Sequence, residues 1–201
     1  MRTYRSVNLN VLWFLIALNV LIFIITLFRS EEVIGLLGLN TAQLRGHPWT
    51  IISSMFVHDP GFWTHILFNM VSLYFLGSFL IRAAGEKSFL AVFFLGGLAG
   101  NLLVILYAHL TGSTIIGYGA SGGVLALGGA LAIMVPKAPV IIFPIPVPMP
   151  LWVATLIFFF ILIILPMLAG GVISWQAHLG GLLLGLIAGL ILRKKRQIYY
   201  F

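Results

Sequence analysis

Apolar residues along this chain form six long runs, separated by short stretches that hold nearly all of the charged side chains. Each run is close to the ~20 residues that a helix needs to cross ~30 Å of hydrocarbon. Helix is the expected conformation, because lipid offers no partners for unpaired backbone groups. The predicted membrane helices are 9–28, 63–83, 88–109, 116–135, 149–168 and 174–192.

Composition supports the same class of protein. Of the 201 residues, 61% are hydrophobic and only 7% are charged, too few charges to cover the surface of a soluble domain. We therefore predict an all-α, polytopic protein of the lipid bilayer, with residues 1–201 forming a single domain. The absence of cysteine excludes disulfides and thiol chemistry.

Basic residues mark the ends of the apolar runs and predict the orientation of the chain. With the N-terminus in the cytoplasm, nine Lys and Arg residues face inward, and only Arg29 and Arg45 face outward. The inner residues are Arg2, Arg5, Arg82, Lys87, Lys137, Arg193, Lys194, Lys195 and Arg196. Both termini are therefore expected to be cytoplasmic. The net charge of +7 reflects orientation, so no nucleic-acid partner is expected.

Two connecting segments have their own patterns. The long outer loop, residues 29–62, mixes apolar and polar residues and is expected to lie along the membrane interface. The inner loop, residues 137–150, has prolines at positions 139, 144, 146, 148 and 150. Proline interrupts helices, so we predict an extended connection there. A cell-membrane location and a prokaryotic source are expected, because no organelle-type presequence precedes the first run.

Four polar side chains fall at a similar depth in the outer part of the predicted bundle. His65 and Asn69 lie in the first two turns of 63–83, and His178 lies a turn from the outer end of 174–192. Ser121 is expected about five residues into 116–135, roughly 8 Å along that helix. Polar groups at membrane depth usually face the bundle interior and mark function. A serine and a histidine on separate helices can form a nucleophile and its base.

Spacing refines this site. His65 and Asn69 are four residues apart and share one helix face, where both can donate hydrogen bonds to a developing oxyanion.

A stripe of small residues predicts how the site is assembled. Gly181, Gly185 and Gly189 recur every four residues, which indicates tight helix packing. Packing of 174–192 against 116–135 would bring His178 to Ser121.

Each of these residues also has a structural interpretation. Membrane serines often bond to a carbonyl of their own helix, and Asn69 could simply join two helices. His58, a loop residue, is interpreted as structural. Its seven-residue spacing from His65 could suggest a metal pair, but no third ligand with metal-like spacing follows. Taken together, Ser121, His178, His65 and Asn69 favour catalysis.

At these residues the chain resembles the rhomboid intramembrane serine proteases. The resemblance runs from about Trp49 to Gly189, with its local patterns in the expected order. These patterns are Trp49-Thr50 through Met55-Phe56-Val57-His58, His65-Ile66-Leu67-Phe68-Asn69-Met70, Gly119-Ala120-Ser121-Gly122, and Ala177-His178-Leu179-Gly180-Gly181 followed by Gly185.

The resemblance implies a six-transmembrane-helix, rhomboid-like bundle that cleaves transmembrane segments with a Ser–His dyad. Ser121 would be the nucleophile and His178 the base, with the Ser121 backbone N–H in the oxyanion hole. It also implies an oxyanion and substrate-binding region formed by His65, Asn69, Gly119 and Ala120. No metal or organic cofactor is implied. Single-pass transmembrane proteins are the expected substrates, and the sequence carries no indication of oligomeric state.

The chain departs from the family pattern at three positions. Thr50 replaces a common arginine, Ile81 stands where many members have an acidic residue, and Leu125 replaces an aromatic residue that stacks on the histidine. These changes would loosen the outer loop and the orientation of His178. The four acidic residues all lie in loops or at segment ends, so no Ser–His–Asp triad is expected.

Two alternatives come from other functional classes. A protease-dead membrane chaperone or binding protein would use the same fold to recognise weak helices. A small-solute transporter would show related halves or broken helices near the midplane, which this sequence lacks.

Overall fold

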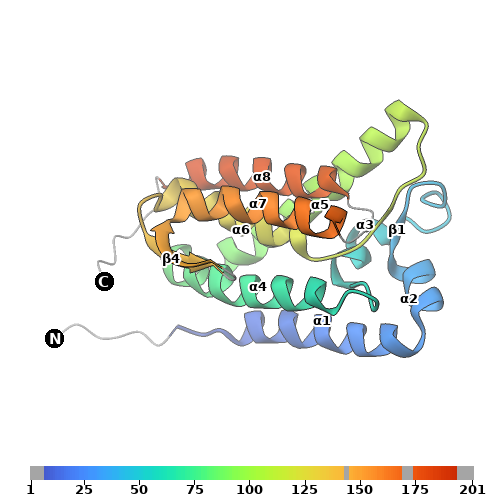
Figure 1. Cartoon of the computed structure of the whole chain (residues 1–201), viewed down its shortest axis with the longest axis horizontal. Helices are drawn as coiled ribbons and strands as arrows, with labels where there is room; N and C mark the ends of the chain where they lie inside the picture. Colours follow the sequence, from blue (N-terminus) through green and yellow to red (C-terminus); the bar gives the residue numbers. More distant parts are fainter. Residues whose placement is uncertain (1–6, 143–144, 169–173, 194–201) are drawn as a thin grey trace.

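The computed structural model describes residues 7–142, 145–168 and 174–193, and six long apolar helices form its framework (Figure 1). They are α1 (Asn10–Phe28), α4 (Trp63–Ala84), α5 (Glu86–Thr111), α6 (Ser121–Met134), α7 (Leu151–Leu168) and α8 (Trp175–Arg193). Helices α1, α4, α5 and α8 are long and apolar enough to cross a membrane. The predicted class, a helical membrane bundle, is confirmed.

The two ends of the bundle carry different charges. Helix α1 begins and α8 ends at the same end, where the hairpin before α7 also lies (Figure 1). The basic residues Arg82, Lys87 and Arg193 belong to helix termini at this end, while Arg29 follows α1 at the other. This separation is what the sequence predicts for an inner and an outer side, and the membrane orientation itself stays a prediction.

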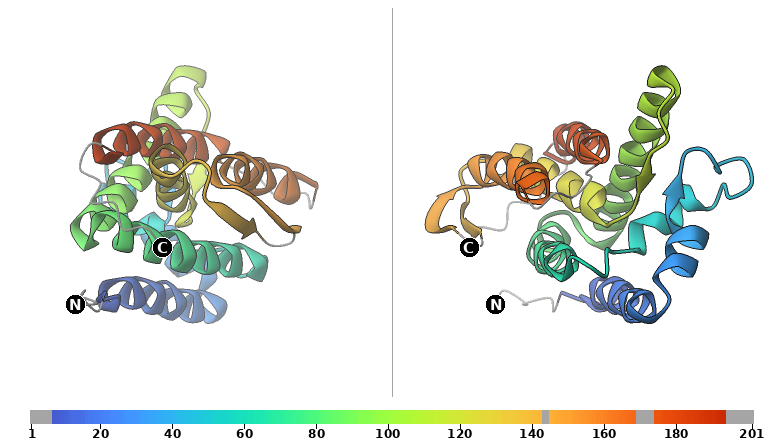
Figure 2. Two further views of the ribbon diagram at one scale, coloured as in Figure 1. Left: turned by 90° about the vertical axis from the view of Figure 1, so that its left-hand side faces the viewer. Right: turned by 45° about the vertical axis from the view of Figure 1, so that its right-hand side comes forward.

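Helix α6 lies in the interior of the bundle and contacts α4, α5, α7 and α8 (Figure 2). Of its 14 residues, all but Ile133 are buried. A helix that is apolar on every side is buried in protein or in lipid, and α6 is buried by the neighbouring helices. Every other long helix keeps exposed apolar side chains on its outer surface, where lipid is the expected solvent.

Helices α6 and α8 approach each other closely along the stripe of small residues. A side chain added at Gly181 would meet the carbonyl of Gly122, one at Gly185 the carbonyl of Ala126, and one at Gly189 the carbonyl of Ala130. The predicted packing role of this stripe is therefore confirmed. Because the obstructing atoms belong to backbone, they cannot move aside as a flexible side chain can.

The start of α6 differs from the prediction. The sequence predicts a helix from residue 116, but α6 begins at Ser121, so the serine is the first helical residue and does not lie five residues along the helix. Residues Ile116–Gly117 form strand β2, which pairs antiparallel with strand β1 (Leu39–Asn40) of the outer loop. Gly119 then adopts a φ of +131°, which ends the extended segment and is incompatible with helix.

The inner loop is extended, as predicted, and its two halves also pair. Strands β3 (Pro139–Ile142) and β4 (Ile145–Pro150) form an antiparallel hairpin in which Pro139 faces Pro150 and Val140 faces Met149. In a two-stranded sheet both strands are edges, so prolines can occupy positions that donate no ladder hydrogen bond. The all-α prediction did not include this hairpin or the β1–β2 pair.

The outer loop contains three short helical elements and is anchored by side chains. They are α2 (Ser30–Leu37), α3 (Thr50–Ser53) and the 3₁₀ helix η1 (Ser54–Phe56). The Trp49 indole N–H donates to the Leu36 carbonyl at 2.8 Å, and the Ser53 hydroxyl donates to the Leu37 carbonyl at 2.8 Å. These bonds fold the loop back on itself near the outer end of the bundle. Its predicted position along the interface stays a prediction.

The close packing of α6 and α8 yields a first prediction. We expect Gly185→Ala to lower the free energy of unfolding by about 1–3 kcal/mol, because the new methyl group has to displace the Ala126 backbone. The matched control is Gly35→Ala in α2, where nothing lies within 4 Å of the new methyl group, and its stability should be unchanged or slightly higher. Thermal unfolding in detergent micelles measures both. Equal stability of the two variants would contradict this packing.

Candidate active site

The hydroxyl of Ser121 and the imidazole of His178 meet in the interior of the bundle. Ser121 Oγ lies 2.8 Å from His178 Nε2, across 57 residues of sequence, and the two side chains are 4% and 7% exposed. A separation of this length is a full hydrogen bond. The structure therefore brings together the pair that the sequence analysis selected, at the depth where α6 begins.

His178 is positioned by the backbone that precedes it. The carbonyl of Ala177 lies against Gly100 of α5, and a Cβ at Gly122 of α6 would also meet this carbonyl, at 3.2 Å. The start of α8 is thus held between two helices that carry glycine at the points of contact. His178 Nδ1 is buried and has no hydrogen-bond partner among the described residues, so no carboxylate orients the ring from behind.

Gly119 is required by two independent constraints. Its φ of +131° is strained for any residue with a side chain. In addition, a Cβ built at this position would lie 2.9 Å from His65 Nε2 and 3.7 Å from Ser121 Oγ. The space that glycine leaves open is therefore shared by the His65 ring and the serine hydroxyl, so the structure also places His65 at the site.

Asn69 is buried one turn below His65 and bonds to its own helix. Its Nδ2 donates to the His65 carbonyl at 2.8 Å, and its Oδ1 is buried with no hydrogen-bond partner among the described residues. One of the two amide N–H groups remains available. The contact to its own helix is a role that the sequence analysis did not weigh for this side chain.

Ala120 occupies the N-cap position of α6 and provides no capping side chain. The first N–H groups of a helix lack partners within the helix and are met by caps, water or ligands. The backbone N–H of Ser121 is therefore not satisfied by its own N-cap. Together with the positive end of the helix dipole, this gives the serine a locally electropositive surrounding.

A hydrogen-bonded chain that the sequence analysis missed holds the segment before Ser121. Asn101 Nδ2 of α5 donates to the Ile51 carbonyl at 2.7 Å and to Ser54 Oγ at 3.0 Å. The Ser54 carbonyl accepts from the Gly119 N–H at 2.9 Å. The bonds of Asn101 therefore lead, through Ser54, to Gly119, two residues before Ser121. Nothing in a lone membrane asparagine signals that path.

His58 is a second residue that sequence reasoning undervalued. It is fully buried, its ring centroid lies 5.1 Å from that of His65, and neither ring nitrogen has a hydrogen-bond partner among the described residues. Burial lowers the pKa of His58 from 6.5 to about 3, and the neighbouring His65 adds to the shift. Among the described residues no third metal-binding side chain joins this pair.

One carboxylate comes closer to the site than the sequence suggested. Asp59 Oδ2 accepts a long hydrogen bond, 3.5 Å, from the hydroxyl of Tyr118, three residues before Ser121. Burial raises the pKa of Tyr118, and Asp59 acts in the same direction. Asp59 Oδ1 accepts from the Gly61 N–H at 2.8 Å, so this acid ties the loop before α4 to the loop before α6.

The three departures from the family pattern are all accommodated in the packing. Thr50 is 1% exposed, and its hydroxyl donates to the His47 carbonyl at 2.7 Å. Ile81 and Leu125 are 5% and 0% exposed and belong to the hydrophobic core. The predicted loosening of the outer loop and of the His178 ring stays a prediction.

Comparison with known proteins identifies the family. A family model described as "Rhomboid domain" matches residues 45–195. The chain is 32% identical over 152 residues to "Rhomboid protein 1, mitochondrial" of Saccharomyces cerevisiae, 34% identical over 170 residues to "RHOMBOID-like protein 12, mitochondrial" of Arabidopsis thaliana, and 30% identical over 130 residues to "Rhomboid protease AarA" of Providencia stuartii. These alignments cover 72%, 75% and 58% of this chain. The chain belongs to the rhomboid family of integral membrane proteins.

The same relatives limit what can be carried over. The alignments span 42%, 48% and 46% of the relatives' own lengths, so this chain corresponds to less than half of each. The relatives come from a yeast, a plant and a bacterium, and two are named mitochondrial. The expected prokaryotic source and cell-membrane location therefore gain no support from them.

The Asn101 chain of hydrogen bonds predicts a measurable local effect. We expect Asn101→Ala to weaken the Gly119–Ser54 bond and speed amide hydrogen exchange at Gly119 by roughly ten- to hundredfold, as expected for the loss of about 1–3 kcal/mol. The control is Asn19→Ala, a fully buried asparagine that bonds only within α1. Exchange measured by NMR in micelles should leave Gly119 unchanged in that variant. An identical rate in both would show that Asn101 does not support the site.

Burial of His58 predicts a pH dependence of stability. In the unfolded chain, His58 is protonated below about pH 6.5. In the folded chain it becomes protonated only when the pH falls to about 3. Stability conferred by a neutral His58 is therefore complete above pH 6.5 and is lost as the pH falls towards 3. We expect His58→Gln to flatten the pH dependence of the unfolding free energy in this window and to leave the slope above pH 7 unchanged. Parallel slopes below pH 6 would contradict the burial of a neutral ring.

Proposed function

We propose that this chain is an intramembrane serine endopeptidase in which Ser121 and His178 form the catalytic dyad. The observation that carries the proposal is the 2.8 Å contact between Ser121 Oγ and His178 Nε2 in a site buried among membrane helices. Membership of a family whose relatives include a protein named a rhomboid protease supports the same reaction class.

The contact defines the protonation state that catalysis requires. If the serine hydroxyl donates, Nε2 accepts, so neutral His178 carries its own proton on Nδ1. As Oγ bonds to the scissile carbonyl carbon, its proton passes to Nε2. The imidazolium then gives this proton to the leaving amine as the carbon–nitrogen bond breaks. A water molecule next attacks the ester carbon of the acyl-enzyme, with His178 taking the water's proton and returning it to Ser121 Oγ as the ester bond breaks.

The surroundings of Ser121 suit the negative charge that develops on the carbonyl oxygen. The Ser121 N–H belongs to the first turn of α6 and so lies at the positive end of the helix dipole. The His65 ring shares the space that Gly119 leaves open. Asn69 retains one amide N–H beyond its bond to the His65 carbonyl. We assign the oxyanion hole to the Ser121 N–H, His65 and Asn69. Gly119 and Ala120 are assigned to the substrate-binding region beside it. Donors placed in advance are worth far more in a buried site than in water.

The substrates are assigned as single-pass membrane proteins whose transmembrane helix unwinds readily. A peptide bond within a helix is shielded by its own turn, whereas an extended segment exposes the carbonyl to attack. The dyad lies near the end of the bundle where α4, α6 and α8 all begin, and we expect an unwound helix end and water to approach it from that end. Polar groups without partners among the described residues lie in this region, such as the ring nitrogens of His58 in the loop before α4 and Asn69 Oδ1 within α4.

The decisive experiment measures cleavage of a model transmembrane substrate by purified protein in detergent. We expect Ser121→Ala and His178→Ala to lower the rate by roughly a thousandfold or more, because each removes a member of a unit that acts together. Matched controls are Ser78→Ala, whose hydroxyl bonds only to its own helix, and His109→Ala at the exposed end of α5, both of which should cleave normally.

A second readout separates the enzyme from a protease-dead relative. An activated serine reacts with a fluorophosphonate probe, so wild-type protein should be labelled at Ser121 and His178→Ala should not. Substrate binding without cleavage or labelling would indicate the chaperone alternative. Equal cleavage by all variants would refute the dyad.

A further inference from the structure

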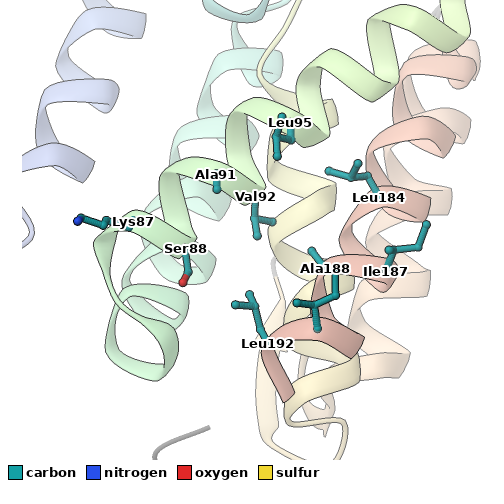
Figure 3. Close-up of a pocket in the computed structure, with 10 residues that line it drawn as sticks. Lys87, Ser88, Ala91, Val92, Leu95, Leu184, Ile187, Ala188 and Leu192 are labelled. Carbon is teal, nitrogen blue, oxygen red and sulfur yellow. The ribbon is translucent and has the colours of Figure 1, made fainter. Parts of the chain in front are cut away.

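A groove separate from the candidate active site opens between α5 and α8 on the outside of the bundle. It has a volume of about 340 Å³, within the range of small-ligand sites (Figure 3). Its walls are apolar, and Ala91, Val92 and Leu95 of α5 face Leu184, Ala188 and Leu192 of α8. Lys87 and Ser88 lie at one end of the groove, with the Lys87 side chain directed outward, away from α8 (Figure 3).

The groove arises because the two helices separate towards one end. Near the active site, α5 and α8 touch through glycine, since a Cβ at Gly180 would lie 2.8 Å from the Cα of Gly100. Towards Lys87 the two helices move apart (Figure 3), and alanine at positions 91 and 188 leaves the space between them unfilled. The bundle therefore carries a long apolar hollow on a surface that faces lipid.

Positive charge gathers where the groove ends. Lys87 is exposed at the start of α5, and Arg193, also exposed, directly follows the lining residue Leu192 at the end of α8. Neither forms an ion pair within the described residues, where the single salt bridge joins Arg29 to Glu32. Glu86 is the one acidic residue beside them, so the mouth of the groove keeps an excess of positive charge.

We propose that this groove binds an anionic phospholipid, with an acyl chain between α5 and α8 and the headgroup phosphate at Lys87 and Arg193. An acyl chain matches a narrow apolar hollow that opens to lipid, and a phosphate accepts charge-assisted hydrogen bonds from both basic side chains. Basic pockets between membrane helices are suited to anionic headgroups.

The charge pattern favours a lipid over a second membrane helix as the occupant. One phospholipid supplies the apolar chain and the negative charge in a single molecule, with the charge already placed at the membrane surface. A partner helix would have to combine an apolar face that fills the groove with an acidic residue at the right position beyond its end, two features that one phospholipid already joins. The Ser88 hydroxyl donates its hydrogen to the Ala84 carbonyl at 2.8 Å, so the proposed phosphate contacts are those of Lys87 and Arg193.

Native mass spectrometry of the protein released from micelles tests the proposal. The probes are phosphatidylglycerol and phosphatidylcholine with identical acyl chains, offered at equal concentration. We expect wild-type protein to retain phosphatidylglycerol preferentially, with each basic side chain contributing roughly fivefold. The double variant Lys87→Gln, Arg193→Gln should lose this preference. The control Arg82→Gln removes a basic side chain at the same end of the bundle but outside the groove, and should keep it.

A second pair of variants tests the apolar part of the site. Ala188→Trp fills the groove and should reduce retention of both lipids, as should the smaller change Ala91→Leu. Leu190→Trp adds the same ring to an exposed position of α8 that does not line the groove, and should behave as wild type. Gel filtration and the unfolding temperature establish that each variant is folded.

Three outcomes would overturn the assignment. The first is equal retention of the two lipids by wild-type protein, and the second is loss of lipid in the control variants. The third is a membrane protein that co-purifies with wild type but not with Ala188→Trp, when wild type shows no preference between the lipids. Cleavage of a model substrate should persist in every variant, because the groove is lined by none of the proposed catalytic residues. Failure of this proposal is therefore distinguishable from failure of the proteolytic function.

Discussion

The close contact between α6 and α8 is the constraint on which the site depends. Gly181, Gly185 and Gly189 let the backbone of α8 pack directly against carbonyl groups of α6. That packing sets His178 within hydrogen-bonding distance of Ser121. Within lipid there is little hydrophobic force between helices, so shape complementarity of this kind decides how they associate.

The proposed nucleophile, Ser121, lies where the helix gives way to extended chain. Ser121 begins α6, and the residues before it pair with the outer loop and turn at Gly119 with a φ of +131°. Non-helical backbone at membrane depth is tolerated only when protein surrounds it, and here the Ser54 carbonyl accepts from the Gly119 N–H. In the proposed protease, this non-helical backbone would meet an extended substrate, which a continuous helix would exclude.

Hydropathy located the helices well and placed the start of α6 wrongly, for one physical reason. Residues 116–120 continue the apolar run that follows them, but Ile116 and Gly117 pair with Asn40 and Leu39, which are far away in sequence, and this pairing makes them extended. His58 was similarly undervalued, because a loop histidine has no local signature of full burial. Asn101 was missed for the same reason, because its hydrogen-bond partners in the outer loop lie 50 and 47 residues away in sequence.

The sequence by itself determined the class of protein, the approximate course of six apolar helices, the small-residue stripe and the polar residues worth testing. These follow from local composition and periodicity, which respond to lipid one segment at a time. Tertiary structure alone decided that Ser121 opens its helix, that His178 Nε2 is the nitrogen facing it, and that α5 and α8 part to form a groove ending at Lys87. Those features depend on where distant backbones meet, and no local pattern records the distance between them.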